Sequence, residues 1–415
     1  MEDRTEGAWI IHHTNKLQQV TNVGEFEEIE LAGKCGLILS GLAASHQESI
    51  LSDDKTKAIA QSVGIKKTEL PVILGKLEEE KLINLSKNGD VAVLGITSAT
   101  VLIHTNTIFK NANPTPYQNA VIDLSEKVSE LPQQQKTLRE YISDTHKLSA
   151  GDTNDLFTQS EEIGFVDFEL VDSTQGKIYF NGNLFRRNDL AKANIVLNSL
   201  KSEEIAKITQ LDEMLKQFGC ITLDKAVRLV GTELMQKMQS IGMYDFNEVS
   251  NDKENKVFVT KPAAFSKYGN PFEEDALDLA KAFVASLSYG MNFSASSRGR
   301  INMLKALLRK LINGYSVGPA TAIGQDYRIL ELKRVVAITH DKNNMYFMKL
   351  LKRDIGEIAM QVLEHGDATE QSLFSLTSSN VTNYRGPESN RRITRKKQTT
   401  QTKKEVVDLL RTFRT

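Results

Sequence analysis

The residues with the most distinctive chemistry in this chain are lysines and arginines, and they gather towards its C-terminal end. Residues 296–353 hold twelve Lys and Arg against three Asp and Glu, a balance of +9. Residues 385–415 hold ten against three, a balance of +7, so the rest carries −17 although the whole chain carries only −1. Two separate basic segments favour nucleic acid as a polyanionic partner. The alternative is that the basic and acidic parts attract each other.

One carboxylate pattern could support catalysis. The tripeptide Glu331-Leu332-Lys333 follows Asp326 and lies in the stretch 327–339, which we expect to be a β-strand. Because strand side chains alternate, Glu331 and Lys333 would share a face. The pattern resembles the motif of restriction-type metal-dependent nucleases, in which two carboxylates hold a divalent ion and the lysine steadies a hydroxide or the scissile phosphate. Asp326 is closer to Glu331 than is usual in that family, and the alternative is a hairpin face of alternating charge.

Other catalytic and metal-binding patterns are absent from the sequence. It has no phosphate-binding loop, nucleophile elbow, HExxH or CxxC spacing, and no paired Cys/His set. The two cysteines, Cys35 and Cys220, are far apart, which favours a reducing cytoplasm over a disulfide framework or a zinc site. No apolar run approaches the roughly 20 residues that span a bilayer, and the first residues do not form a secretory signal. We therefore expect a cytoplasmic protein that is not an enzyme and has no cofactor, metal or membrane partner.

The most informative pattern is the stretch 55–96. Apolar residues recur at helical spacing up to Gly64, a residue type that ends helices and takes sharp turns. A second apolar stripe follows from 70 to 77, with Pro71 in its first turn and Thr68 as a suitable N-cap. Two short apolar runs then flank Lys87-Asn88-Gly89-Asp90, whose Asn-Gly pair is typical of a β-hairpin.

Helix, turn, helix and hairpin in about 40 residues resembles the winged helix-turn-helix superfamily. The resemblance implies that the second helix lies in the DNA major groove and that the hairpin, or wing, touches the backbone. Carried onto this chain, it implies nucleic-acid contacts by Lys66, Lys67, Thr68, Val72 and Lys76, with Lys87 and Asn88 on the wing. Glu69 and the run 78–80 would repel phosphate, so protein docking or a solvated face remains the alternative.

Two looser copies of this order follow. Residues 136–185 predict two helices and a hairpin, but acids crowd the second helix, and an acidic helix enters a phosphate-lined groove only at a large electrostatic cost. We therefore expect this copy to dock on protein. Residues 220–262 repeat the order with more evenly spread lysines. Units recurring at about 80 residues indicate an internal repeat.

The basic C-terminal part combines helices and strands. A helix expected over 300–312 presents a basic face, and a hairpin expected from the strands 327–339 and 345–351 carries further cations. After Gly366 the sequence becomes rich in Ser, Thr, Asn and Gln, and we expect a flexible tail that contacts phosphates without reading sequence. The nucleic-acid-binding candidates here are Arg298, Arg300, Lys305, Arg309, Lys310, Arg328, Arg334, Arg391, Arg392, Arg395, Lys396 and Lys397.

These patterns predict a fold that is mainly α with small β-hairpins, built from tandem winged-helix-like domains and a basic α+β C-terminal domain. The first part also contains an expected N-terminal strand, Trp9-Ile10-Ile11, beyond which His12 and His13 would point to opposite sides and so would not form a metal site. The expected parts are 1–110, 117–188, 189–270, 271–366 and the tail 367–415.

Three functions agree with the sequence, and each has its own signal. The leading interpretation is a non-enzymatic nucleic-acid-binding protein whose target is duplex DNA. The second is an adaptor or accessory subunit of a larger DNA-acting machine, in which the winged units dock on proteins, and the acidic second copy motivates it. The third is a metal-dependent nuclease centred on Glu331 and Lys333.

Overall fold

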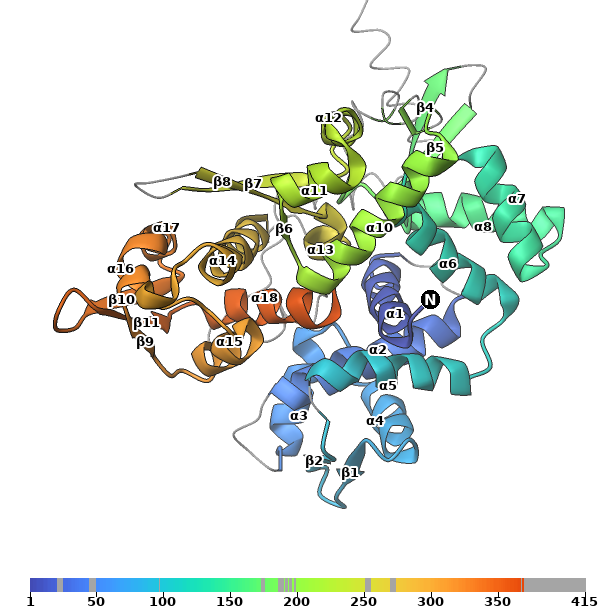
Figure 1. Cartoon of the computed structure of the whole chain (residues 1–415). Coiled ribbons are helices and arrows are strands. Elements are labelled where there is room, and N and C mark those ends of the chain that lie inside the picture. The colour runs from blue at the N-terminus through green and yellow to red at the C-terminus, as the bar shows by residue number, and fades with distance from the viewer. Residues whose placement is uncertain are drawn as a thin grey trace, which may run out of the picture. The chain divides into compact units, whose positions relative to one another are not determined.

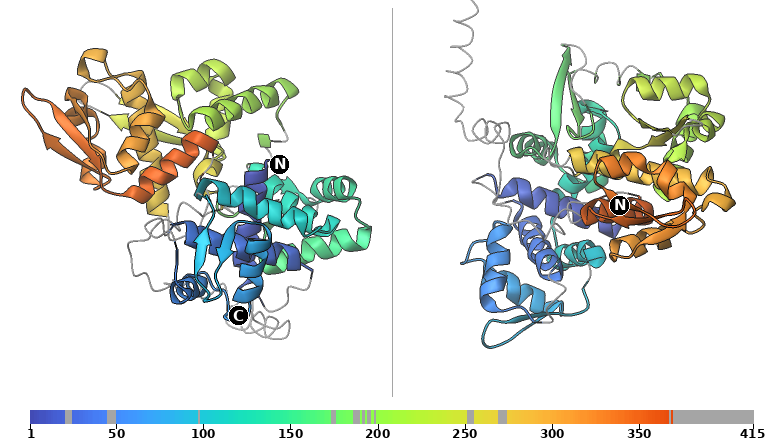
Figure 2. Two further views of the ribbon diagram at one scale, coloured as in Figure 1. Left: turned by 90° about the horizontal axis from the view of Figure 1, so that it is seen from below. Right: turned by 90° about the vertical axis from the view of Figure 1, so that its left-hand side faces the viewer.

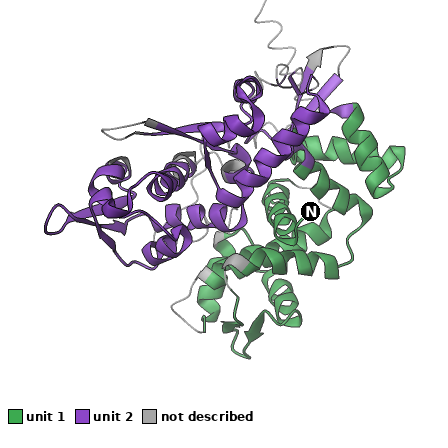
Figure 3. Ribbon diagram, viewed as in Figure 1, with its two compact units in different colours: residues 1–126, 136–167, 377–415 green, residues 127–135, 168–376 purple. Residues whose placement is uncertain are grey.

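The computed structural model describes residues 1–20, 25–44, 50–96, 98–172, 176–185, 190, 193, 196, 197, 199–250, 255–268, 274–366 and 368. As the sequence predicts, the chain is mainly helical and has small antiparallel sheets (Figure 1). It divides into two compact units (Figure 3). Of the residues described, the first unit contains 1–126 and 136–167, and the second contains the others. Within these ranges no helix is both long and apolar enough to cross a bilayer.

Three helices form the centre of the first unit: α1 (Asp3–Leu17), α2 (Glu27–Ala44) and α5 (Ser98–Asn111), each packed against the other two. Glycines allow this close approach. A Cβ on Gly33 of α2 would lie 1.9 Å from Thr14 Oγ1 of α1, and one on Gly36 would lie 2.3 Å from Thr105 Oγ1 of α5. These two glycines therefore serve helix–helix packing.

The strand predicted at 9–11 is wrong, because these residues lie inside α1. Every residue from Gly7 to Thr14 is buried, so the middle of the helix is buried all round and its sequence lacks the one-sided pattern of a surface helix. His13 is part of this core: its Nε2 lies 2.9 Å from Ser125 Oγ and its ring centroid lies 4.1 Å from that of Phe165. Burial lowers the pKa of His13 well below its usual value.

The stretch 55–96 folds as two helices and a hairpin, as predicted. The elements are α3 (Asp53–Ser62), α4 (Leu70–Glu79), β1 (Ile83–Leu85) and β2 (Val91–Val93). Both α3 and α4 pack on α2, and the predicted apolar stripe of α4 is buried. Leu51 pairs with Val91 through two backbone hydrogen bonds of 2.8 Å. The return strand β2 therefore has β1 on one side and the Leu51 bridge on the other.

The same order of elements occurs three more times within the residues that the structure describes. In each copy a helix is followed by a short strand, two helices and a hairpin, and the return strand of the hairpin is central in a three-stranded sheet. The second copy consists of α6 (Pro116–Glu130), β3 (Gln133–Gln134), α7 (Gln135–His146), α8 (Ala150–Ile163), β4 (Asp167–Asp172) and β5 (Gly176–Phe180). The third consists of α10 (Ser202–Phe218), β6 (Ile221–Thr222), α11 (Leu223–Val230), α12 (Thr232–Ser240), β7 (Asp245–Ser250) and β8 (Asn255–Thr260).

The fourth copy lies in the segment for which the sequence predicts only a basic α+β domain. It consists of α15 (Leu304–Ile312), β9 (Val317–Ala320), α16 (Thr321–Asp326), α17 (Arg328–Leu332), β10 (Val336–His340) and β11 (Tyr346–Leu350). The β10–β11 hairpin extends away from the helices of its own unit (Figure 2). The helices α14 (Glu274–Asn292) and α18 (Arg353–His365) pack together and, with α15, form one continuous hydrophobic core.

Two local predictions in this segment are wrong. Within the predicted strand 327–339, Arg328–Leu332 is helix α17, and the strand begins only at Val336. The helix predicted from Arg300 begins at Leu304, so Arg298 lies in a short 3-10 turn, Ser296–Arg298, and Arg300 lies in the loop after it.

Candidate nucleic-acid interface

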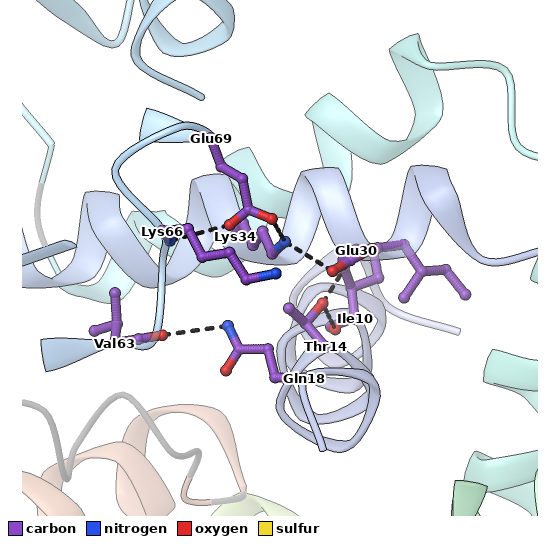
Figure 4. Close-up of polar contacts among 9 residues, drawn as sticks. Ile10, Thr14, Gln18, Glu30, Lys34, Val63, Lys66 and Glu69 are labelled. Carbon is purple, nitrogen blue, oxygen red and sulfur yellow. Dashed lines mark hydrogen bonds and ion pairs between the residues drawn. The ribbon is translucent and has the colours of Figure 1, made fainter. Parts of the chain in front are cut away.

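The turn between α3 and α4 is fixed from two sides. Gly64 takes the left-handed conformation (φ +77°) that lets the chain reverse, and Ile65 is buried beneath the turn. From α1, Gln18 Nε2 donates a hydrogen bond of 3.2 Å to the Val63 carbonyl. From α2, Lys34 binds Glu69, which immediately precedes α4 (Figure 4). The first unit therefore holds the start of α4 in a defined position.

Lys34 is the centre of this anchor. Its Nζ lies 2.7 Å from Glu30 Oε1 and 2.9 Å from Glu69 Oε1 (Figure 4). Burial alone would lower the pKa of Lys34, but these two carboxylates outweigh it and raise that pKa. Burial would likewise raise the pKa of Glu69, but the hydrogen bonds from Lys34 and from the Lys66 amide lower it. Both charges are therefore retained at neutral pH.

Glu69 also replaces the predicted N-cap. Its Oε2 accepts a 3.0 Å hydrogen bond from the backbone N–H of Lys66, and Glu69 itself occupies the N-cap position of α4. Thr68, the residue predicted to cap the helix, is exposed in the turn before it. Pro71 lies in the first turn of α4, as predicted.

The acids predicted to repel phosphate are already engaged within the unit. Glu78 Oε1 accepts a 3.1 Å hydrogen bond from the Leu85 amide. Lys76 Nζ lies 2.9 Å from Glu79 Oε2 and 3.3 Å from Glu80 Oε1. These contacts satisfy the acids, and they also occupy Lys76, which the sequence predicts to contact nucleic acid.

Lys66, Lys67 and Lys87 differ from Lys76. All three are exposed, and among the described residues none of their ammonium groups has an ion-pair partner. Lys66 and Lys67 precede α4, and Lys87 lies with Asn88 at the tip of the β1–β2 hairpin. The outward face of α4 is uncharged between them and the acids at its far end: Val72 is 65% exposed and Gly75 faces open space. Of the cations predicted to contact nucleic acid in this repeat, the free ones therefore lie before α4 and on its hairpin.

The predicted cations of the fourth repeat also divide into engaged and free groups. Arg298 Nη2 lies 2.8 Å from Asp326 Oδ1, Arg300 Nε donates to the Met291 carbonyl over 2.7 Å, and Arg309 pairs with Glu364 of α18. By contrast, Lys305, Lys310 and Arg334 are exposed and have no ion-pair partner in the part of the chain that the structure describes.

For the remaining predicted contact residues, the structure does not describe the side chains. Arg328 begins α17. Arg391, Arg392, Arg395, Lys396 and Lys397 lie outside the described residues.

The residues of the nuclease pattern do not have the arrangement that the motif requires, with Glu331 and Lys333 on one face of a strand. Asp326 ends α16 with its side chain fully buried against Arg298 and Ser294. Glu331 lies in helix α17, and Lys333 follows that helix, so no strand places the two on one face. Among the described residues, no group of three His, Cys, Asp or Glu side chains is arranged to hold a metal ion.

The second helix of the other two copies presents a different surface. In α8, Asp152, Asp155 and Glu162 are exposed, as the sequence predicts. In α12, Lys237 pairs with Glu233 at 3.0 Å, which leaves the helix nearly neutral. Neither α8 nor α12 therefore carries a lysine or arginine without an ion-pair partner.

No sequence pattern predicts the roles of Gln18 and Lys34, the two residues that position the start of α4. Their partners lie 45 and 35 residues away in the chain, and no motif or spacing connects such distant positions. No protein-family model matches the chain, and no curated protein shows significant similarity to it. We therefore infer function from geometry and charge.

Proposed function

We propose that this protein is a non-enzymatic nucleic-acid-binding protein whose target is duplex DNA, and that its four copies are winged-helix units. The repeated order of helix, strand, two helices and hairpin, with a central return strand, supports the second part. In that family the second helix of the pair enters the major groove and the hairpin follows the backbone.

The observation that carries the proposal is the distribution of free charge on the first copy. Lys66 and Lys67 lie before α4, and Lys87 lies on the hairpin, without internal partners among the described residues. The acids at the far end of α4 are neutralised or hydrogen-bonded within the unit. Docking with the start of α4 foremost would place free ammonium groups on phosphates and keep the carboxylates away from them.

The fourth copy would add affinity without sequence readout. Lys305, Lys310 and Arg334 are exposed, and such cations bind phosphate oxygens and release condensed counterions. Arg298 and Arg309, which the sequence places in the same group, pair with carboxylates of the second unit. We therefore assign them a supporting role.

The experiment is a titration of full-length protein into labelled duplex DNA at two salt concentrations with Mg²⁺ present, followed by a denaturing gel. Binding that weakens steeply with salt, on DNA that stays intact, is the expected result. No binding at the lower salt would reject the proposal. Cleaved DNA would reject its non-enzymatic part.

The acidic face of α8 favours a second candidate, an adaptor that docks on a basic protein surface. Asp152, Asp155 and Glu162 are exposed on that helix, where they would repel phosphate. An adaptor would bind isolated DNA weakly, and Lys66→Gln with Lys67→Gln would leave that weak binding unchanged. The same titration therefore separates the two candidates.

We also propose that the protein works in a reducing compartment such as the cytoplasm. Cys35 and Cys220 are both free and buried, and burial raises the pKa of each thiol to about 12. Cysteines that form no disulfide are typical of a reducing compartment, and thiols held in this protonated state react slowly with oxidants and disulfides.

A further inference from the structure

A groove of about 360 Å³ runs along α15 in the fourth copy. One wall is the loop before the helix, 299–303, and the other includes Val317 of β9. Ala306, Leu307 and Lys310 of α15 line it lengthwise. None of the internal ion pairs of this copy lies among the lining residues.

The middle of the groove is apolar. Ile301 and Val317 are buried beneath it, Leu307 is half-buried, and Met303 is 72% exposed at its edge. A planar ligand could therefore contact both the exposed Met303 side chain and the apolar surface beside it. Tyr315, which is 63% exposed, follows α15 and donates its backbone N–H to the Lys310 carbonyl over 3.1 Å.

The two cations that line the groove lie near opposite ends of α15: Arg300 is four residues before its start and Lys310 is two residues before its end. At one end, the bond from Arg300 Nε to the Met291 carbonyl fixes the guanidinium, whose Nη groups have no hydrogen-bond partner among the described residues. The nine-residue helix α15 also starts here without a side-chain cap, so its first N–H groups and its dipole favour an anion. Lys310 lies at the other end, seven residues beyond Met303, or about 10 Å along the helix. No acid lines the groove.

We propose that this groove binds one unpaired nucleotide of single-stranded nucleic acid. The base would lie on the apolar middle, and its flanking phosphates would lie at Arg300 and at Lys310. Apolar side chains hold extruded bases in this way, and sequence-tolerant stacking with cationic flanks is how single strands are bound. A base within a duplex reaches such a groove only after unpairing. The inference rests on the proposed function and narrows it to DNA with single-stranded ends or gaps.

The test compares two lysines of the same helix. Lys305 and Lys310 are both exposed and without ion-pair partners among the described residues, but only Lys310 lines the groove. Full-length variants Lys305→Gln and Lys310→Gln would be titrated by fluorescence anisotropy against a short labelled oligothymidylate and against a blunt duplex with the same number of phosphates. A third variant, Ala306→Glu, places a carboxylate in the groove at an exposed position.

For the single strand, we expect Lys310→Gln and Ala306→Glu each to weaken binding about tenfold or more, and Lys305→Gln only about twofold. For the blunt duplex, the two glutamine variants should lose affinity equally. Equal losses on the single strand, with Ala306→Glu silent, would overturn the inference while duplex binding by the wild type still supports the proposed function. Wild type that binds neither probe would overturn both.

A labelled polyglutamate peptide serves as the competing probe, because an acidic chain would also suit two cations. Tighter binding of this peptide than of the oligothymidylate, abolished in Ala306→Glu, would overturn the nucleotide assignment and give the groove to acidic peptides. Circular dichroism melts of each variant check that the fold is retained.

Discussion

Lys34→Met tests how the first unit positions the start of α4. The substitution keeps an unbranched apolar stem of similar length but removes the ammonium that joins Glu30 of α2 to Glu69. Both carboxylates would then lose their internal counter-charge. We expect the turn before α4 to loosen. We also expect the negative charge of Glu69, no longer balanced by Lys34, to weaken the positive potential of Lys66 and Lys67.

The magnitude follows from burial. Only 10% of the Lys34 side chain is exposed, against 21% for Glu30 and 31% for Glu69. Removing one partner of a fully buried pair costs about 3–5 kcal/mol. Here the freed carboxylates regain some water, so the loss should be about 2–3 kcal/mol. For a unit of this size that corresponds to a Tm lower by about 4–12 °C.

Hydrogen exchange of the α4 amides is the appropriate assay, because two compact units need not unfold together. Lys110→Met is the matched control: Lys110 pairs with Asp3 and Glu6 in the same unit, but its side chain is 53% exposed. An exposed pair of this kind contributes little. Equal loss of protection in α4 in the two variants, or no loss in Lys34→Met, would contradict this expectation.

Three further perturbations test the packing and electrostatics of the fold. Gly33→Ala should destabilise the first unit by about 1–3 kcal/mol, because its methyl group would lie 1.9 Å from a hydroxyl oxygen of α1. Gly75 faces open space, so Gly75→Ala should instead stabilise the unit by up to about 1 kcal/mol. Urea denaturation measures both changes. His13→Gln should flatten the pH dependence of stability. Burial lowers the pKa of His13, so the contribution of the neutral ring to wild-type stability is complete above the ordinary pKa of 6.5 and is lost as the pH falls below it. Thermal melts of both proteins across that pH range measure the difference. Asp326→Asn should cost about 2–4 kcal/mol in thermal unfolding, because it leaves a partly buried arginine without its counter-charge.

Each of these has an outcome that contradicts it. Equal stability of the two glycine variants would mean that α1 and α2 do not pack as closely as described. An unchanged pH profile in His13→Gln would mean that another group controls the acid side. Asp326→Asn as stable as the wild type would return that carboxylate to consideration as a functional group.

The sequence was most informative where elements are amphipathic and turns carry glycine. Gly64, Pro71 and the Asn-Gly pair at the hairpin tip mark the elements between 53 and 93, and the structure confirms them. The sequence misled where helices are buried all round or very short. The run 9–11 has the β-branched and aromatic residues of a strand but lies in a core helix, and apolar runs alone do not separate the two. The five residues of α17 are too few to show a helical period.

The sequence predicts which residue types form the candidate site, but not which of their side chains pair with residues of other elements. The sequence places Lys66, Lys67 and Lys76 in one group, yet only Lys76 is held by internal carboxylates. In the same way it groups Arg298 and Arg309 with Lys310, although both arginines are paired. The partners of the two arginines lie in other elements and depend on tertiary packing, which no local pattern contains, whereas the partners of Lys76 lie three and four residues further along the chain, a spacing that a helix brings together.

The most direct test of DNA binding through the first copy is the salt dependence of the double variant Lys66→Gln, Lys67→Gln. Its control is Lys57→Gln with Lys110→Gln, two lysines of the same unit that already have ion-pair partners. The measured quantity is the slope of log affinity against log salt concentration. Each phosphate that is no longer neutralised makes this slope less negative by about 0.9, so the double variant should change it by about 1.8. The slope of the control variant should not change. Equal slopes in the wild type and both variants would contradict the proposal that Lys66 and Lys67 bind the phosphate backbone.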